Sequence, residues 1–411
     1  MRSSRRDLPV SAAGRNVLGI DVGKGRHAAA GLKSDGQVIK PRLSFENDRT
    51  GIDRLEKTLL KPLGGPKGVL VAMEATGHYW MPLYFELSRR GYEAVVINPI
   101  QTNAKFRARI RRAKTDKLDA VTIARLVLSG EARAARVPDE RTLELRLLTR
   151  HRWRLADTAS NLHRFALSLV DRIFPEYNGL FSEPLRPTTR RLIREIGLAP
   201  GQLLEASDRV GPVLHAGSHG RIGPERAIEL LERAGRSIGI GKAEGVMVAQ
   251  LRSCVELIEV IERQTGLLDE ELVRRVRELG SPLPSLGVRA PIAATIHAES
   301  DPISDFRHPW QYAAFAGLDP SVFQTGQFTG TQAHISKRGS PHLRKVLYLT
   351  AMSLYRHHTD LYRCYQKSRR KGRHHTYAVV VVAHKLARIV WRMLTDNRPF
   401  RARPPRHTKP A

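Results

Sequence analysis

Short apolar runs alternate with amphipathic stretches along the first 130 residues of the chain, and their order predicts an α/β domain. The first three runs follow one another with short polar breaks, one of them at Gly36, which predicts a meander of strands. Later runs alternate with helical periods, and Gly91 and Pro99 separate them. The predicted strands lie at about 17–22, 26–32, 37–45, 68–74 and 93–98, and the predicted helices at about 50–62, 78–90 and 116–129.

Acidic residues occupy the ends of three of these elements. Three meandering strands followed by strand–helix units match the order of a ribonuclease H-like fold, in which the first strand, the fourth strand and the last helix converge on one sheet edge. Asp21 follows the first apolar run and Glu74 closes the fourth. Asp116 and Asp119 lie three residues apart where the last helix begins, so they share one helical face. One carboxylate at a strand end is usually a solvated cap, but four on one domain predict a cage for hard divalent cations.

From Pro138 to about residue 280 the apolar pattern changes to heptads, which predict two long helices forming an antiparallel coiled-coil arm. An ordinary helical bundle is the alternative. Gly266 and Arg275 weaken the second seam. Between the helices, residues 174–245 are rich in Gly, Pro and Arg and are predicted to form an inserted helical subdomain, to which the pattern assigns no chemistry. The main seam positions are Leu148, Leu155, Leu162 and Leu169, then Met247, Leu251, Cys254, Ile258, Ile261, Thr265, Leu268, Leu272 and Leu279.

Residues 281–397 are predicted to form a mainly α carboxy-terminal domain, followed by a basic tail over 398–411. The domain's first residues resemble a helix–hairpin–helix, whose glycine turn offers N–H groups to a DNA phosphate, although only Gly287 of the usual glycine pair is present. Beyond Asp360 the only acid is Asp396, so the surface is predicted to contact phosphates, with a solvated charged face as the alternative. The candidate nucleic-acid contacts are Lys114, Lys337, Arg338, Arg344, Lys345, Arg369, Arg370, Lys371 and Arg373.

The charge of the chain points to a polyanionic partner. Lys and Arg number 69 against 40 acids, a formal net charge of +29, for which nucleic acid is the first explanation and a ribosome-associated or membrane-surface role the second. Residues 1–15 are basic, are predicted to be disordered, and contain no apolar stretch for a signal peptide. Charged side chains interrupt the apolar stretch 377–394 well short of a membrane span. Cys254 and Cys364 show no metal-ligand spacing, so we expect a reduced, cytoplasmic protein without structural disulfides or zinc. With nucleic acid as the expected partner, we also expect association with the nucleoid.

Six short blocks together resemble the DEDD insertion-sequence transposases, a family that includes the pilin-gene-inverting recombinases and the bridge-RNA-guided recombinases. They cover both ends of the chain in the family's order, while the middle is similar only in its coiled-coil character. The single hairpin glycine departs from the pattern and puts the DNA role of that element in doubt. The blocks are Gly19-Ile-Asp-Val-Gly-Lys, Met73-Glu-Ala-Thr-Gly, Val96-Ile-Asn-Pro, Lys114-Thr-Asp-Lys-Leu-Asp-Ala, Phe315-Ala-Gly-Leu-Asp-Pro and Ile335-Ser-Lys-Arg-Gly.

The resemblance implies a RuvC-like domain over 16–137 that holds Mg²⁺, two ions being expected, on the four acids. It also implies a transposase domain with a nucleophilic serine, which the Ser-Lys-Arg-Gly block places at Ser336. Ser340, directly before Pro341, is expected to cap a helix instead. Donor and target DNA, a structured non-coding guide RNA and a homo-oligomer, either a dimer or a tetramer with composite active sites, are the implied partners.

The chemistry expected from these residues is metal-assisted attack of a serine on a DNA phosphate. A serine hydroxyl is a weak nucleophile and needs a metal or a base beside it. Lys337 and Arg338 are placed to hold the phosphate and offset its developing charge. A covalent serine–DNA link conserves the phosphodiester energy, so strands can be rejoined without a nucleotide cofactor. The expected enzyme is a recombinase that inserts and excises its own mobile element.

Three other interpretations compete. The Gly19 block also resembles a phosphate loop of actin-like kinases and chaperone ATPases, but a second Asp-x-Gly loop and a glycine-rich adenosine site are missing from the sequence. A non-catalytic architectural protein would explain the charge and the arm but leave four well-placed carboxylates without a role. A RuvC-like Holliday-junction resolvase, with water as nucleophile, keeps the acids and needs no Ser336; it is the main alternative.

Overall fold

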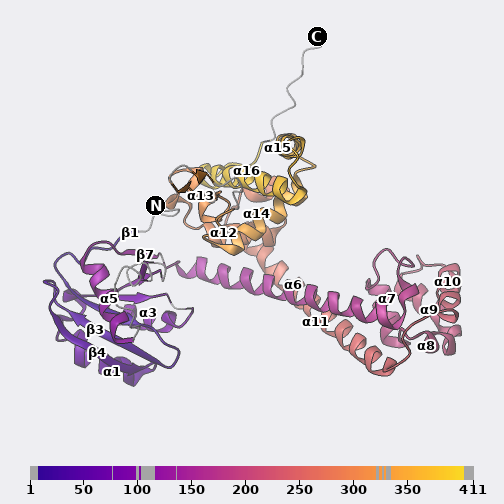
Figure 1. Ribbon diagram of the computed structural model, residues 1–411, viewed down its shortest axis with the longest axis horizontal. Coiled ribbons are helices and arrows are strands. Elements are labelled where there is room, and N and C mark those ends of the chain that lie inside the picture. The colour runs from indigo at the N-terminus through magenta and orange to yellow at the C-terminus, as the bar shows by residue number, and fades with distance from the viewer. Residues whose placement is uncertain are drawn as a thin grey trace, which may run out of the picture. The chain divides into compact units, whose positions relative to one another are not determined.

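The computed structural model divides the chain into two compact units, Met1–Asp139 and Glu140–Ala411 (Figure 1). The structure describes the backbone but not the side chains of residues 116–119 and of the short strands at 8–9, 324–325 and 328–329. The described residues are 8–75, 77–98, 101–102, 116–135, 137–320, 324–325, 328–329 and 335–401.

A mixed seven-stranded sheet forms the first unit, with strand order β1-β7-β6-β5-β2-β3-β4. Strands β2, β3 and β4 form an antiparallel meander, and β5 and β6 add to it in parallel with β2. This arrangement is compatible with a ribonuclease H-like fold. The strands are β1 (Leu8–Pro9), β2 (Asn16–Asp21), β3 (Arg26–Leu32), β4 (Val38–Glu46), β5 (Val69–Glu74), β6 (Glu93–Ile97) and β7 (Arg133–Ala135).

Helices cover both faces of this sheet, because successive strand residues are buried alternately on either side. On one face Leu18, Ile20 and Val71 pack against the helices that follow β4 and β5. On the other face Val17 and Leu70 pack against the helix that begins at Asp116. The helices of the first face are α1 (Arg49–Leu55), the π-helical turn η1 (Glu56–Leu60) and α3 (Trp80–Arg89); α5 (Asp116–Leu128) covers the second, and the short α2 (Gly65–Gly68) leads into β5.

All five predicted strands and three predicted helices of this unit are confirmed, with ends displaced by one or two residues except where α1 gives way to η1. The prediction that residues 1–15 are disordered is wrong for residues 8–15. Strand β1 pairs with β7, Val10 N donates to Ala132 O at 3.0 Å, and Arg15 pairs with Glu93 at 2.6 Å. Strands of two or three residues are too short to show a period, so the sequence pattern missed both of them.

Two long antiparallel helices, α6 (Glu140–Ile173) and α11 (Glu244–Glu278), form the arm of the second unit (Figure 1). Arg275, which interrupts the predicted seam, instead pairs with Glu144 of α6 at 2.6 Å. The helices at the distal end are α7 (Pro187–Glu195), α8 (Pro200–Glu205), α9 (Ser207–Gly217) and α10 (Pro224–Gly235), after the turn η2 (Pro175–Tyr177). At the other end lie η3 (Leu283–Leu286), α12 (Ala290–Ser300), η4 (Ile303–Asp305), α13 (Pro309–Phe315), strands β8 (Gln324–Thr325) and β9 (Phe328–Thr329), α14 (Pro341–Leu354), α15 (Thr359–Arg370) and α16 (His375–Asp396).

The carboxy-terminal helices do not form a core by themselves. Leu145 from α6 and Leu272 and Val276 from α11 are buried in the same cluster, so a domain boundary at 281 cuts through a core. The expected helix–hairpin–helix also needs correction, because only the four-residue 3₁₀ turn η3 precedes Gly287, which has φ of +83°. Within the described parts of the chain, no helix is long and apolar enough to cross a membrane.

Candidate active site

Asp21 and Glu74 end neighbouring parallel strands in register. Ile20 of β2 lies opposite Met73 of β5, and the two acids are the next residues along. Both are half-buried. Side-chain alternation places Asp21 on the face of Gly19 and Glu74 on the face of Ala72, which is the face that α5 covers. Because paired strands lie about 4.8 Å apart, the two carboxylates project side by side from the same face of the sheet, at the ends of neighbouring strands.

Helix α5 crosses β2 in direct backbone contact at Gly19. A Cβ atom there would lie 2.1 Å from Ala120 O and 2.8 Å from Ala124 N, so only glycine permits this approach. Asp116 begins α5, one turn before Ala120, and Gly19 lies two residues before Asp21. The helix start that carries Asp116 and Asp119 is therefore held close to the strand end that carries Asp21. The side chains of those two helix acids, and Lys114, lie outside the described residues.

Thr102 is a residue of this edge that sequence reasoning missed. Its buried hydroxyl donates to Glu74 Oε2 at 2.7 Å, which orients the carboxylate and leaves the second oxygen for another partner. Nothing in the sequence pattern distinguishes this threonine. Among residues with described side chains, no group of three His, Cys, Asp or Glu is clustered tightly enough to hold a metal. Asp21 and Glu74 nevertheless fit a divalent cation, because they offer hard oxygen ligands from adjacent strand ends. The bond from Thr102 already orients the carboxylate of Glu74.

In the second unit, the loop containing Ser336 is hydrogen-bonded to residues 315–320. Ser336 N donates to Asp319 O at 2.8 Å, Lys337 N to Gly317 O at 3.2 Å, and Ser340 N to Phe315 O at 2.8 Å. A Cβ on Gly339, which has φ of +110°, would lie 1.9 Å from Phe315 O. The Phe315 and Ile335 blocks, which are apart in the sequence, thus form one structural element.

The Ser336 side chain points at a carboxylate. Its hydroxyl donates to Asp319 Oδ1 at 2.5 Å and accepts a bond from Arg338 N at 3.3 Å. Such an acceptor can take the proton of an attacking hydroxyl, although the same bonds also stabilise a tight turn. Asp319 belongs to the Phe315 block, but nothing in the sequence pattern gives it a role.

Two family models match the parts of the chain that carry these features. One, described as a transposase, matches residues 18–175, and the other, described as the transposase IS116/IS110/IS902 family, matches residues 285–366. Together the two matches span more than half of the chain. The chain belongs to the IS110 family of DEDD transposases.

Relatives align with this transposase over nearly its whole length. It is 25% identical to the uncharacterized 44.8 kDa protein of insertion element IS116 of Streptomyces clavuligerus, over 94% of this chain and 96% of that protein. It is 24% identical to the uncharacterized 42 kDa protein of insertion element IS900 of Mycobacterium paratuberculosis, over 92% and 95% of the two chains. A putative transposase, y4rJ, of Sinorhizobium fredii is 26% identical over 66% of this chain and 62% of that protein.

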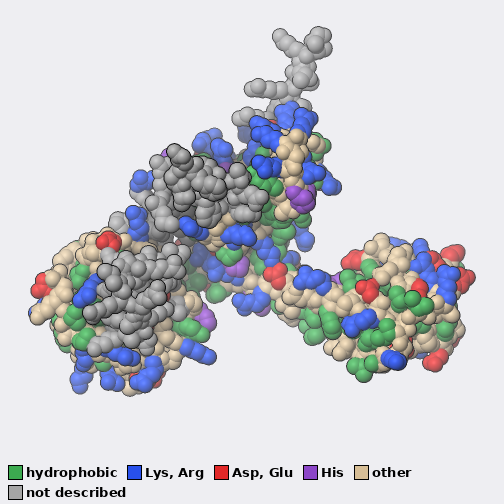
Figure 2. Space-filling model, viewed as in Figure 1, with side chains coloured by type: hydrophobic (Ala, Val, Ile, Leu, Met, Phe, Trp, Pro, Cys, Tyr) green, Lys and Arg blue, Asp and Glu red, His purple; other side chains and the backbone are tan. Residues whose placement is uncertain are grey.

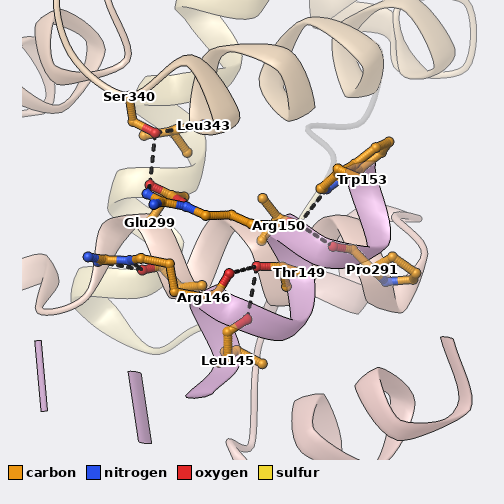
Figure 3. Close-up of polar contacts among 11 residues, drawn as sticks. Leu145, Arg146, Thr149, Arg150, Trp153, Pro291, Glu299, Ser340 and Leu343 are labelled. Carbon is orange, nitrogen blue, oxygen red and sulfur yellow. Dashed lines mark hydrogen bonds and ion pairs between the residues drawn. The ribbon is translucent and has the colours of Figure 1, made fainter. Parts of the chain in front are cut away.

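Ser340 of the transposase caps α14, as predicted. Its hydroxyl accepts a bond from Leu343 N at 3.1 Å and donates to Glu299 Oε2 at 2.9 Å (Figure 3). Glu299 is 2% exposed. Arg150 of α6 donates to it twice, from Nε to Oε1 at 2.8 Å and from Nη2 to Oε2 at 3.2 Å. Burial alone would raise the pKa of Glu299, but the bonds and charges of Arg150, with Arg146 and Ser340, hold that pKa below its usual value. The helix that follows the Ser336 loop is therefore anchored to the arm through a buried carboxylate.

The basic residues expected to contact nucleic acid fall into two groups. Arg344 donates to Ala316 O at 3.1 Å, with a pKa lowered by burial, and Lys345 pairs with Asp157 at 2.6 Å beside the Trp153 ring. Both side chains are half-buried and already bonded within the second unit, and their contact with phosphates stays a prediction. On the face drawn in Figure 2, Lys and Arg gather over the carboxy-terminal helices with few acids among them. The exposed members of the predicted set are Lys337, Arg338, Arg369, Arg370, Lys371 and Arg373.

Proposed function

We propose that this transposase cuts and rejoins DNA strands to insert and excise its own mobile element, using a RuvC-like acidic site and a serine nucleophile. The observation that carries the proposal is the in-register pairing of Asp21 and Glu74 beneath the start of α5. A structural role would not require four acids at this edge, because like charges held close together repel one another. A bound divalent cation acting on a phosphate would offset that repulsion and give the acids a chemical role.

The acids Asp21, Glu74, Asp116 and Asp119 are proposed to hold the metal. A divalent cation bound there, Mg²⁺ and two ions in this proposal, supplies polarisation of the scissile phosphate and stabilisation of its leaving oxygen. Asp21 and Glu74 provide carboxylate oxygens from the strand ends, and Thr102 fixes the orientation of Glu74. The excess of basic side chains elsewhere draws DNA to the surface and neutralises its phosphates.

Ser336 is proposed to form the covalent link. Its oxygen attacks the phosphorus of the scissile phosphodiester, its proton passes to Asp319, and the bond from phosphorus to the deoxyribose oxygen breaks. The departing oxygen takes up a proton and becomes a DNA hydroxyl end. Rejoining reverses these steps when a different DNA hydroxyl attacks the serine phosphodiester, so the number of phosphodiester bonds is conserved. Lys337 and Arg338 are exposed beside the serine and hold the phosphate during both steps.

Ser336→Ala is expected to eliminate the covalent protein–DNA adduct trapped from a cleavage reaction, because no hydroxyl remains at the attacking position. Denaturing gel electrophoresis of labelled DNA, followed by peptide mapping, measures the adduct. Ser340→Ala is the matched control, since it removes the cap of α14 but should leave the adduct in place. An adduct mapped to another hydroxyl residue, such as Thr325 between the two blocks, would refute the assignment to Ser336.

Normal cleavage by Ser336→Ala, with no adduct in the wild-type protein, would support the resolvase alternative. In that mechanism the acids act on water and the strands are hydrolysed. The Asp319–Ser336 contact favours the serine, because it supplies a base within hydrogen-bonding distance of the nucleophile.

A structured non-coding RNA is proposed to select the DNA target, with the protein acting as a homo-oligomer. The sequence contains no clear helix-turn-helix or zinc finger, and its charge excess suits backbones rather than base edges. A guide RNA that pairs with the target DNA would supply the sequence specificity that these basic side chains do not.

Purified transposase should bind a structured RNA from the flank of its element more tightly than unrelated RNA of equal length in a filter-binding assay. Changing the pairing loops of that RNA should redirect insertion to the newly complementary DNA, as read by sequencing the junctions. Site-specific recombination by protein stripped of all RNA would exclude RNA guidance.

A further inference from the structure

A cavity of about 900 Å³ opens in the carboxy-terminal helices, away from the Ser336 loop in the sequence. It lies between the start of α15, the second half of α16 and residues 398–401. Leu361, Ile389, Met393 and Phe400 give it an apolar lining. A cavity of this volume matches a ligand of nucleotide size.

Residues 398–401 complete the cavity because they fold back onto the domain. Phe400 N donates to Ser285 Oγ at 2.8 Å, and the Phe400 ring meets the His358 ring edge-on at 5.2 Å. Arg398 N donates to Met393 O at 3.1 Å. The sequence predicts a basic tail over 398–411, whereas residues 398–401 form one wall of a cavity in the domain. An aromatic ring fixed in the lining of an apolar cavity offers a surface for stacking.

Cations outnumber acids around the cavity. Its lining includes five basic side chains, Lys385, Arg388, Arg392, Arg398 and Arg401, and two acids, Asp360 and Asp396. Arg392 pairs with Asp396 at 2.7 Å, and Lys385 Nζ donates to the Asp360 carbonyl at 2.9 Å. For Arg388, Arg398 and Arg401 the described residues provide no carboxylate partner. The first turn of α15 reaches the same cavity without a side-chain cap, which adds partial positive charge from backbone N–H groups.

We propose that this cavity binds one unpaired nucleotide of a single-stranded nucleic-acid segment. The base occupies the apolar floor and stacks on Phe400, while Arg388, Arg398 and Arg401 contact the adjoining phosphates. Apolar side chains, an aromatic ring and basic side chains lining one cavity are the combination that single-strand binding uses. A base in an intact duplex stays stacked on its neighbours and cannot enter. The inference rests on the proposed function, because it requires that the chain acts on nucleic acid. It adds a binding site for an unpaired stretch of a nucleic-acid strand.

Phe400→Ala is expected to weaken binding of full-length transposase to single-stranded probes by roughly tenfold and to leave duplex binding unchanged, because only unpaired bases can stack on the ring. Fluorescence anisotropy with single-stranded RNA, single-stranded DNA and duplex DNA of equal length measures this difference. Arg388→Gln should weaken single-strand binding and reduce the salt dependence by about one phosphate contact. Binding needs no cleavage, so the result is separable from a failure of the acids or Ser336.

Arg369→Gln is the matched control for the arginine variant, since Arg369 is exposed on α15 but does not line the cavity. It should weaken single-strand and duplex binding to the same extent. A loss by Phe400→Ala confined to RNA identifies the occupant as an RNA strand, and a loss confined to DNA identifies a displaced DNA strand. Unchanged single-strand affinity in a folded Phe400→Ala protein, or an equal loss for duplex, would overturn the proposal.

Discussion

Asp21→Asn is expected to lower DNA strand cleavage in Mg²⁺ by roughly 1,000-fold, because losing one carboxylate ligand removes several kcal/mol of transition-state stabilisation. Asparagine has the same shape, so the strand end and the register with β5 should persist. The substitution also relieves repulsion among the acids, so the thermal midpoint without metal should stay level or rise. Cleavage of a labelled DNA substrate, DNA-binding affinity and thermal unfolding measured on one preparation test all three expectations.

Two further variants make this test specific. Asp35→Asn, in the turn between β3 and β4 where Asp35 accepts a bond from Gln37 N at 2.8 Å, should cleave as the wild type does. Thr102→Val keeps the volume but removes the bond to Glu74, and is expected to lower cleavage by roughly tenfold with a rise in the Mg²⁺ concentration required. Wild-type recombination by Asp21→Asn would show that these acids are not the metal site.

Arg150→Ala is expected to destabilise the second unit by about 3 kcal/mol, because it leaves the buried Glu299 carboxylate without its main partner. Urea unfolding at neutral pH, followed by circular dichroism, measures the change in midpoint. The contribution has a pH dependence of known sign. Because the pKa of Glu299 is lowered in the folded protein, its stabilisation is present above the unfolded pKa and is lost as pH falls through the folded pKa. The difference between wild type and variant should therefore narrow in acid.

A double mutant separates the charge from the packing. Adding Glu299→Gln to Arg150→Ala removes the unpaired charge, so part of the lost stability should return. Arg274→Ala, which breaks exposed ion pairs with Glu271 and Glu278 on α11, should barely move the urea midpoint. If Arg150→Ala and Arg274→Ala shift the midpoint equally, the buried carboxylate does not anchor α14 to the arm.

The sequence predicted the elements of the first unit well because their signals are local. Continuous apolar runs mark β2 and β5 as strands, and the acids at their ends mark the sheet edge where α5 approaches. Pairing between elements is not local, and the two shortest strands of the sheet were missed for that reason. Strands β1 and β7 are recognisable only through their partners, since two or three residues carry no period.

The candidate residues show the same limit. Thr102 lies 28 positions from Glu74, and Arg150 lies 149 positions from Glu299, so neither contact has a pattern in the sequence. Arg344 and Lys345 are predicted phosphate contacts because they lie in a basic stretch, and the sequence gives no sign of their partners within the fold, Ala316 O and Asp157. Charge alone shows which surface attracts nucleic acid, but not which side chains already support the fold.

The two ends of the arm belong to different cores, so the arm sets the distance between the distal helices and the carboxy-terminal helices. Ala166, Leu169 and Leu251 belong to the distal core, while Leu145 and Leu272 belong to the proximal one. Between them, no residue of 150–165 or 259–271 is buried. One heptad added to or removed from both helices would keep their facing sides aligned and move the distal helices by roughly 10 Å along the arm. Such a change, made between the two cores, would alter the reach of the distal helices and leave the buried residues of each core in place.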